Sequence, residues 1–164
     1  MLAQRRLSHA RGYLALGMVA EAAAELAQLP APDAETTEAL TLRIAVLHEQ
    51  ENWPGVRDLA RELIHREAAD AAIWVTLAYA TRRADSLIAA EIVLIKAEKL
   101  HPEEPTIQFN LGCYACQRGD LIGARLRVGR AIELDPKFRE IAASDPDLAP
   151  LRAAHPGSFA PPPP

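Results

Sequence analysis

Apolar residues recur along the chain at the three- and four-residue spacing of amphipathic helices, in segments separated by short polar or proline-containing stretches. The first two segments cover roughly residues 3–16 and 19–29. A later one begins near Asn52, because asparagine is a favoured helix N-cap and Pro54 suits a first helical turn. The pattern therefore predicts consecutive helix pairs and no strand between residues 3 and 138.

Residues 71–136 nearly repeat themselves with a period of 34. The matched positions, first copy and then second, are Leu77 and Leu111, Ala78 and Gly112, Ala90 and Ala124, Leu94 and Val128, Ala97 and Ala131, and Pro102 and Pro136. Small residues at two of these positions let paired helices approach closely. Proline ends the second helix of each copy, since it lacks an N–H and clashes with the preceding turn. We expect Gly112 and Ala124 to face each other across one such pair.

This period and the Trp74-x-x-Leu77-Ala78 stretch resemble the tetratricopeptide repeat family. The resemblance implies an all-α, right-handed superhelix of four helix–turn–helix repeats followed by a C-terminal capping helix. With no insertions, the repeats cover residues 3–36, 37–70, 71–104 and 105–138. The second repeat departs most, because Ile44 and Val56 replace small residues. The hairpin turns are expected near Gly17–Met18, Glu51–Trp53, Arg83–Ser86 and Gly119–Asp120.

A single repeat domain over residues 3–152 is expected, and its last part should serve as a cap. A solenoid needs a terminal cap because its last repeat otherwise exposes an apolar face. The capping segment 139–152 follows Phe138, and the apolar residues that can supply the cover are Phe138, Ile141, Leu148 and Leu151. Residues 153–164 end in four prolines and should form an extended, flexible tail. Docking of that proline run on an aromatic groove is an alternative.

In this family the first helix of each repeat lines a concave surface that binds a peptide or helix of a partner protein. Carried onto this chain, the resemblance implies a groove formed by Leu7, Arg11, His48, Val75, Tyr79, Arg82, Arg83, Phe109, Cys113 and Cys116. Val75, Tyr79 and Phe109 would form its apolar floor. Some relatives clamp chaperone C-terminal carboxylates with lysine and asparagine, and Leu7 and Arg11 stand at two of those places. The resemblance thus favours a non-enzymatic interaction scaffold without that clamp.

Net charge and the distribution of apolar residues limit the partners and the location that we expect. The formal net charge of −4 gives no reason to expect nucleic acid or an anionic membrane as a partner. The N-terminus lacks an uninterrupted apolar signal region, and no apolar stretch reaches the length of a membrane span. A cytoplasmic location is therefore expected. A small cytosolic secretion chaperone, similar to those of type III systems, is an alternative of comparable size and repeat class.

Cys113 and Cys116 form the only motif with redox or metal spacing. A redox pair of this kind normally lies at a helix N-terminus, where the dipole lowers the thiol pKa, whereas this pair falls in mid-helix. A zinc site needs about four ligands, and there is no second cysteine pair. We expect two small apolar groove residues, with no metal, cofactor or catalytic residue. A thiol or metal protein remains the less favoured alternative.

Overall fold

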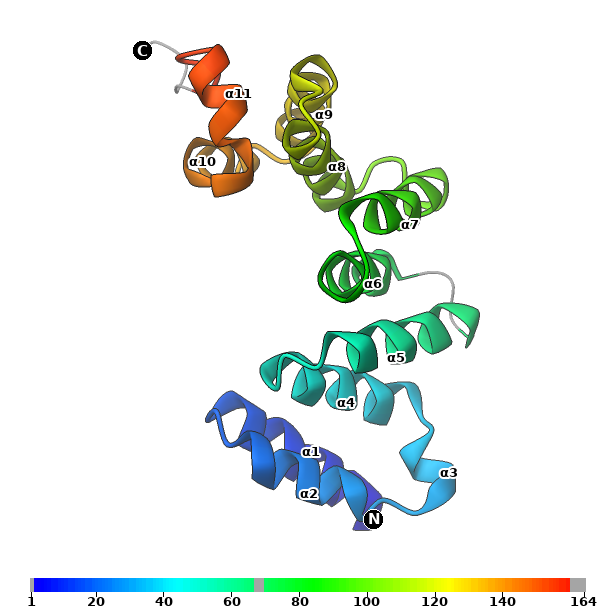
Figure 1. The fold of residues 1–164 in the computed structure, drawn as a ribbon. Coiled ribbons are helices and arrows are strands. Elements are labelled where there is room, and N and C mark those ends of the chain that lie inside the picture. The colour runs from blue at the N-terminus through cyan, green and yellow to red at the C-terminus, as the bar shows by residue number, and fades with distance from the viewer. Residues whose placement is uncertain (1, 67–69, 160–164) are drawn as a thin grey trace. The chain divides into compact units, whose positions relative to one another are not determined.

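The computed structural model describes residues 2–66 and 70–159, and every regular element in those ranges is helical (Figure 1). The first half of the chain forms α1 (Leu2–Ala15), α2 (Val19–Ala27), α3 (Ala31–Ala34), α4 (Thr37–Glu49), α5 (Trp53–Arg66) and α6 (Ala71–Ala84). The second half forms α7 (Leu87–Leu100), α8 (Pro105–Gln117), α9 (Leu121–Leu134), α10 (Phe138–Ser144), the 3₁₀ helix η1 (Pro146–Leu148) and α11 (Ala149–Ala154). The predicted all-α helical-repeat fold class is confirmed.

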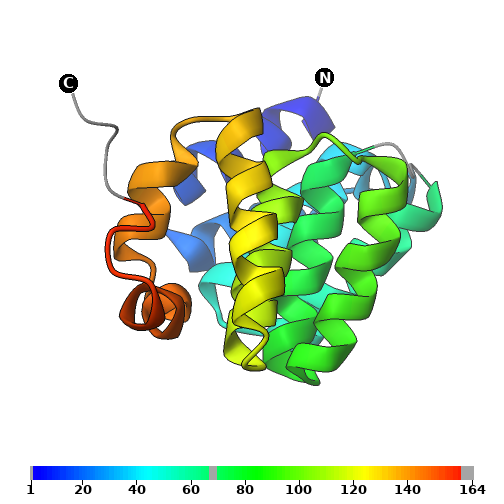
Figure 2. The ribbon, with the colours of Figure 1, turned by 90° about the horizontal axis from the view of Figure 1, so that it is seen from above.

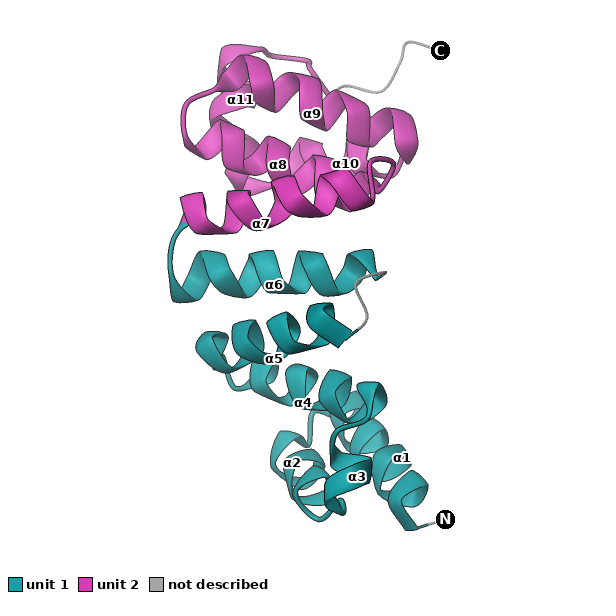
Figure 3. Ribbon diagram, turned by 90° about the vertical axis from the view of Figure 1, so that its right-hand side faces the viewer, with its two compact units in different colours: residues 1–86 teal, residues 87–164 magenta. Residues whose placement is uncertain are grey.

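The chain divides into two compact units, Met1–Ser86 and Leu87–Pro164 (Figure 3). The boundary falls between α6 and α7, inside the predicted repeat 71–104. The helix pair that the sequence assigns to this repeat is therefore shared between the units.

In unit 1, α1 packs against α2, α4 packs against both α2 and α5, and α5 packs against α6 (Figure 1). The N-terminal core includes Ala10 and Ala22, which are completely buried, as the small-residue positions of a closely packed helix pair require. The short helix α3 was not predicted. It occupies the proline-containing stretch before α4, whose first turn is capped by the Thr36 hydroxyl accepting the N–H of Ala39.

All four predicted turns are found where one helix ends and the next begins. Gly17 and Gly119 have φ values of 71° and 85°, which favour glycine. Glu51 has φ of 54°, a left-handed conformation that is uncommon for a residue with a side chain. Directly after it, the Asn52 side-chain oxygen accepts the N–H of Gly55 at 3.1 Å, which confirms the predicted cap of α5.

In unit 2, α8 is almost entirely buried and packs along α9. A Cβ atom at Gly112 would lie 2.7 Å from Val128 Cγ2 and 3.3 Å from the Ala124 carbonyl oxygen. The predicted close contact between Gly112 and Ala124 is therefore confirmed. Only glycine permits this separation of the two helices.

The C-terminal segment covers unit 2 with two short α-helices and a 3₁₀ turn rather than one capping helix. α10 and α11 lie beside α9, and η1 and α11 also pack on α8 (Figure 2). Phe138, Leu148 and Leu151 are buried, as expected for the cap, whereas Ile141 is 40% exposed. The segment is fastened by polar contacts too, because Gln117 donates to the Asp147 carbonyl oxygen at 2.8 Å.

Residues 153–159, which were expected to belong to an extended tail, are partly ordered by helix and burial. α11 includes residues 153 and 154, and Phe159 is buried. The helix-free pattern of this stretch did not indicate the burial of Phe159. Residues 160–164, which contain the proline run, lie outside the described residues.

Candidate functional site

The N-terminal residues predicted for the groove do not offer a free surface. Leu7 is buried in the core formed by α1, α2 and α4, so its assignment to a groove is wrong. Arg11 is exposed on α1, but its guanidinium forms an ion pair with Glu38 on α4. Arg11 therefore serves as a link between two first helices of successive repeats.

The three groove residues predicted on α8 are also buried. Phe109 is 5% exposed and packs against Phe138, with ring centroids 5.0 Å apart. Cys113 and Cys116 are buried and not disulfide-bonded. The expectation of an exposed floor that includes Phe109 is corrected, because Phe138 of α10 packs on Phe109 and η1 packs against α8.

The predicted residues His48, Tyr79 and Arg83 do come together, in unit 1, and Trp53 joins them. We call these four residues the aromatic cluster. The His48 ring lies 5.1 Å from the Trp53 ring and 5.7 Å from the Tyr79 ring, and Trp53 lies 5.5 Å from Tyr79 in an edge-to-face arrangement. Edge-to-face and offset contacts at these distances are favourable. Tyr79 remains 38% exposed.

Local structure explains how Trp53 reaches the cluster. His48 lies in the last turn of α4, and Trp53 is the first residue of α5. The left-handed Glu51 and the Asn52 cap reverse the chain between them. Sequence reasoning identified Trp53 only as a helix start. The sequence signal that could have indicated the cluster is an aromatic residue beside a tight turn, next to the helix end that bears His48.

Arg83 lies over two rings of the cluster. Its guanidinium carbon is 3.5 Å from the centroid of the Tyr79 ring and 4.9 Å from that of Trp53. Both separations are within the range of a cation–π interaction. Val75 and Arg82, the other predicted groove residues of α6, are half-buried.

A small pocket opens between the N-terminal halves of α4 and α6. Its volume is about 170 Å³, and its lining residues are Thr37, Thr41, Ile44, Leu63, Asp70, Ala72, Ile73 and Thr76. Leu63 of α5 is fully buried. We call the strip of surface that contains this pocket and the aromatic cluster the α4–α6 seam.

The pocket and the cluster lie on the same stripe of each helix. On α4 this stripe contains Thr37, Thr41, Ile44 and His48. On α6 it contains Ala72, Thr76, Tyr79 and Arg83. Residues spaced by four, three and four positions share one helix face. With a rise of 1.5 Å per residue, the two ends of the seam are about 16 Å apart.

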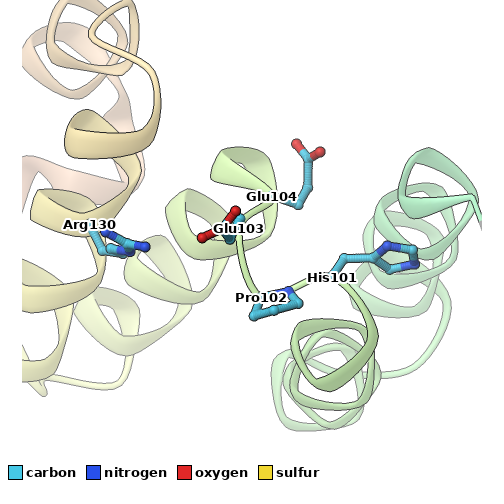
Figure 4. A pocket seen from close by; sticks show the side chains of 5 residues that line it. All are labelled: His101, Pro102, Glu103, Glu104 and Arg130. Carbon is cyan, nitrogen blue, oxygen red and sulfur yellow. The ribbon is translucent and has the colours of Figure 1, made fainter.

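A second, open depression in unit 2 lacks such organisation. Its volume is about 510 Å³, and it is lined by His101, Pro102, Glu103, Glu104 and Arg130. Figure 4 shows the His101 ring directed away from Arg130. Arg130 pairs with Glu133, and the Glu104 side chain caps α8 by accepting the N–H of Thr106. These groups are already used within the chain.

Unit 2 also carries exposed apolar side chains in repeat register. Ile88 and Ile92 on α7 are exposed, as are Ile122 and Leu126 on α9, each 34 positions later. The same repeat positions thus face solvent in two successive second helices.

Among the described residues, no three histidine, cysteine or acidic side chains lie close enough together to hold a metal ion. No helix in those ranges is long and apolar enough to cross a membrane.

The comparisons with known proteins give structural matches alone. No protein-family model matches the sequence, and no curated protein does either. The thermophilic TPR protein TTC0263 of Thermus thermophilus matches with a TM-score of 0.67 and 20% identity, over 92% of this chain and 87% of that one. This chain has the tetratricopeptide repeat fold. MamA AMB-1 matches with a TM-score of 0.64 and 19% identity, over 94% of this chain and 85% of that one. MamA MSR-1 matches with a TM-score of 0.63 and 21% identity, over 96% of this chain and 90% of that one.

Proposed function

We propose that this tetratricopeptide repeat chain is a non-enzymatic scaffold that binds a segment of a partner protein along the α4–α6 seam. The aromatic cluster is the observation that carries the proposal. Tyrosine, tryptophan and arginine are the residue types that dominate binding energy at protein interfaces. Here the exposed Tyr79 and Arg83 and the half-buried Trp53 gather at one end of a stripe whose other end is a pocket.

The size of the pocket favours a side chain of a partner over a free small molecule. Small-molecule sites usually measure about 300–1,000 Å³. The seam pocket is about 170 Å³, and Ile44, Leu63, Ala72 and Ile73 line it together with three threonines and Asp70. Such a cavity suits one aliphatic side chain.

The polar groups of the seam are suited to binding rather than to bond cleavage. Thr41 donates its hydroxyl to the Thr37 carbonyl oxygen at 2.8 Å, and Thr76 donates to that of Ala72 at 2.9 Å. Both hydroxyls thus donate to carbonyl oxygens of their own helices rather than to a base among the described residues. A nucleophile needs such a base within hydrogen-bond distance.

Selection from a phage-displayed library of random dodecapeptides tests the proposal. Fluorescence anisotropy then compares the affinity of the selected peptides for the original chain with their affinity for Ala72→Trp. This variant places a large ring at the mouth of the pocket. Ala24→Trp is the matched control, because Ala24 is an exposed helical alanine on α2, away from the seam. The proposal expects Ala72→Trp to weaken binding and Ala24→Trp to leave it unchanged. Failure to select any peptide, or equal effects of both variants, contradicts it.

A further inference from the structure

Arg83, like Arg5 and Arg43, has no acidic partner among the described residues of unit 1. By contrast, Arg6, Arg11, Arg57 and Arg66 each form an ion pair with a carboxylate. Asp85, only two positions after Arg83, pairs with Arg57 of α5 at 2.6 Å. Arg83 instead contacts the rings of Trp53 and Tyr79. Thus no described carboxylate neutralises its charge.

The rings fix the guanidinium while leaving its N–H groups available. Trp53 and Tyr79 meet at an interplanar angle of 73°, and the guanidinium lies against both. A ring contact uses the flat face of a guanidinium, whereas hydrogen bonds leave from its edge. An arginine held in this way loses less side-chain entropy on binding. Its fork of donors matches the two oxygens of a carboxylate.

A partner cation does not fit this end of the seam. An aromatic cluster binds lysine or quaternary ammonium groups when the faces of its rings are open. Here Arg83 already occupies the space over Tyr79 and Trp53, and it would repel a second cation. The charge of the cluster therefore selects an acidic group.

The distance along the seam sets the spacing of the groups it binds. The pocket residues of α6, Ala72 to Thr76, lie about 10–16 Å before Arg83 along the helix. An extended peptide advances about 3.3 Å per residue, so about three to five residues cover this distance. An aliphatic side chain in the pocket thus places a residue about three to five positions away beside Arg83.

We infer that the partner segment is extended and carries an aspartate or glutamate bound by Arg83, about three to five residues from an aliphatic residue in the seam pocket. The inference rests on the proposed peptide-binding function and specifies its partner. His48, whose ring stacks on Tyr79, adds a second hydrogen-bonding group at the acidic end.

The same dodecapeptide library tests the inference when it is selected separately on the original chain and on Arg83→Met. Methionine keeps an unbranched apolar side chain over the rings and removes the charge. Peptides selected on the original chain should combine an aliphatic residue with an acidic residue about three to five positions away. Selection on Arg83→Met should retain the aliphatic residue and lose the acidic one. Arg61→Met is the matched control, since Arg61 is an exposed arginine of α5 that does not line the seam pocket.

A double-mutant cycle then measures the contact itself. In a selected peptide, replacing the glutamate with glutamine should weaken binding to the original chain and to Arg61→Met about tenfold, the size expected of a charge-assisted pair. It should change binding to Arg83→Met little. The inference is overturned if the replacement weakens binding equally to all three chains, or if selection enriches lysine and arginine. If binding is still weakened by Ala72→Trp in that case, the proposed function stands. Binding that is insensitive to Ala72→Trp overturns both.

Discussion

Arg127 on α9 donates one hydrogen bond to each carboxylate oxygen of Glu98 on α7. Gln108 on α8 completes the link: it donates to Glu98 at 2.9 Å and accepts from Arg127 at 2.9 Å. Three helices of unit 2 are thus joined by one polar network. The hydrogen bond from Arg127, together with that from Gln108, lowers the pKa of Glu98 below its ordinary value, against the opposing effect of burial.

Replacing Glu98 with glutamine should destabilise the chain in a pH-dependent manner. A carboxylate with a lowered pKa stabilises the fold above its ordinary pKa, and this contribution is lost as the pH falls through the lowered value. Glu98→Gln should therefore reduce the free energy of unfolding by about 1–2 kcal/mol near neutral pH, and the difference should shrink in acid. Urea unfolding followed by circular dichroism over a pH series measures it.

Glu133→Gln provides the control for that series. Glu133 also pairs with an arginine of α9, but its side chain is largely exposed. Its removal should cost less than about 0.5 kcal/mol. A constant difference between Glu98→Gln and the original chain from neutral to strongly acidic pH would show that the network contributes no linked stability.

Alanine substitutions at two glycines should have opposite effects. Gly112→Ala places a Cβ 2.7 Å from Val128 Cγ2, so we expect a loss of about 1–3 kcal/mol, and more for Gly112→Leu. Gly129 lies in the middle of α9, and nothing would contact an added Cβ within 4 Å. Gly129→Ala should therefore stabilise the chain by about 0.5–1 kcal/mol. Thermal melts measure the change in melting temperature of each variant. Equal melting temperatures for the two would contradict the close contact at Gly112.

The cap should contribute strongly to the stability of unit 2. Phe138 is buried against Phe109, so Phe138→Ala should cost about 3–5 kcal/mol. Ile141 lies on the same short helix and is 40% exposed, and Ile141→Ala should cost about 1 kcal/mol or less. Urea unfolding of both variants measures the difference. Similar losses would indicate that Phe138 is not a packing anchor of the cap.

Tyr79→Ala should weaken the binding of seam peptides by about 1–2 kcal/mol, because an aromatic anchor and the support for Arg83 are both lost. Arg82→Ala should act mainly through the association rate and its salt dependence, as expected of a charge at the rim. Stopped-flow binding at two ionic strengths separates these effects. Leu16→Ala, which removes an exposed apolar side chain from unit 1 outside the seam, should change neither quantity.

Sequence alone could predict the helix pairs and their turns because both depend on local spacing. Gly119 and the Asn52 cap belong to this class, as does the Gly112 contact, which follows from the repeat period. The burial of Phe109 could not be predicted from local spacing. The repeat register identifies the side of α8 on which Phe109 lies, but not that Phe138 folds back over it.

For a similar reason, the sequence predicted three residues of the aromatic cluster and missed the fourth. His48, Tyr79 and Arg83 follow from the positions of first helices in the repeat. Trp53 lies outside those positions, and its approach to the cluster depends on the left-handed backbone at Glu51. Repeat patterns describe the helices, whereas this contact is made by the turn that connects them.

The division into two units also separates the natural spectroscopic reporters of the chain. Both tryptophans, Trp53 and Trp74, lie in Met1–Ser86, and both cysteines, Cys113 and Cys116, lie buried in Leu87–Pro164. Tryptophan fluorescence, excited where tyrosine does not absorb, therefore follows the loss of structure in the first unit, while the rate of thiol labelling follows the opening of the second. Without any engineered label, the two signals together tell whether the halves of this repeat protein unfold as one cooperative block or one after the other.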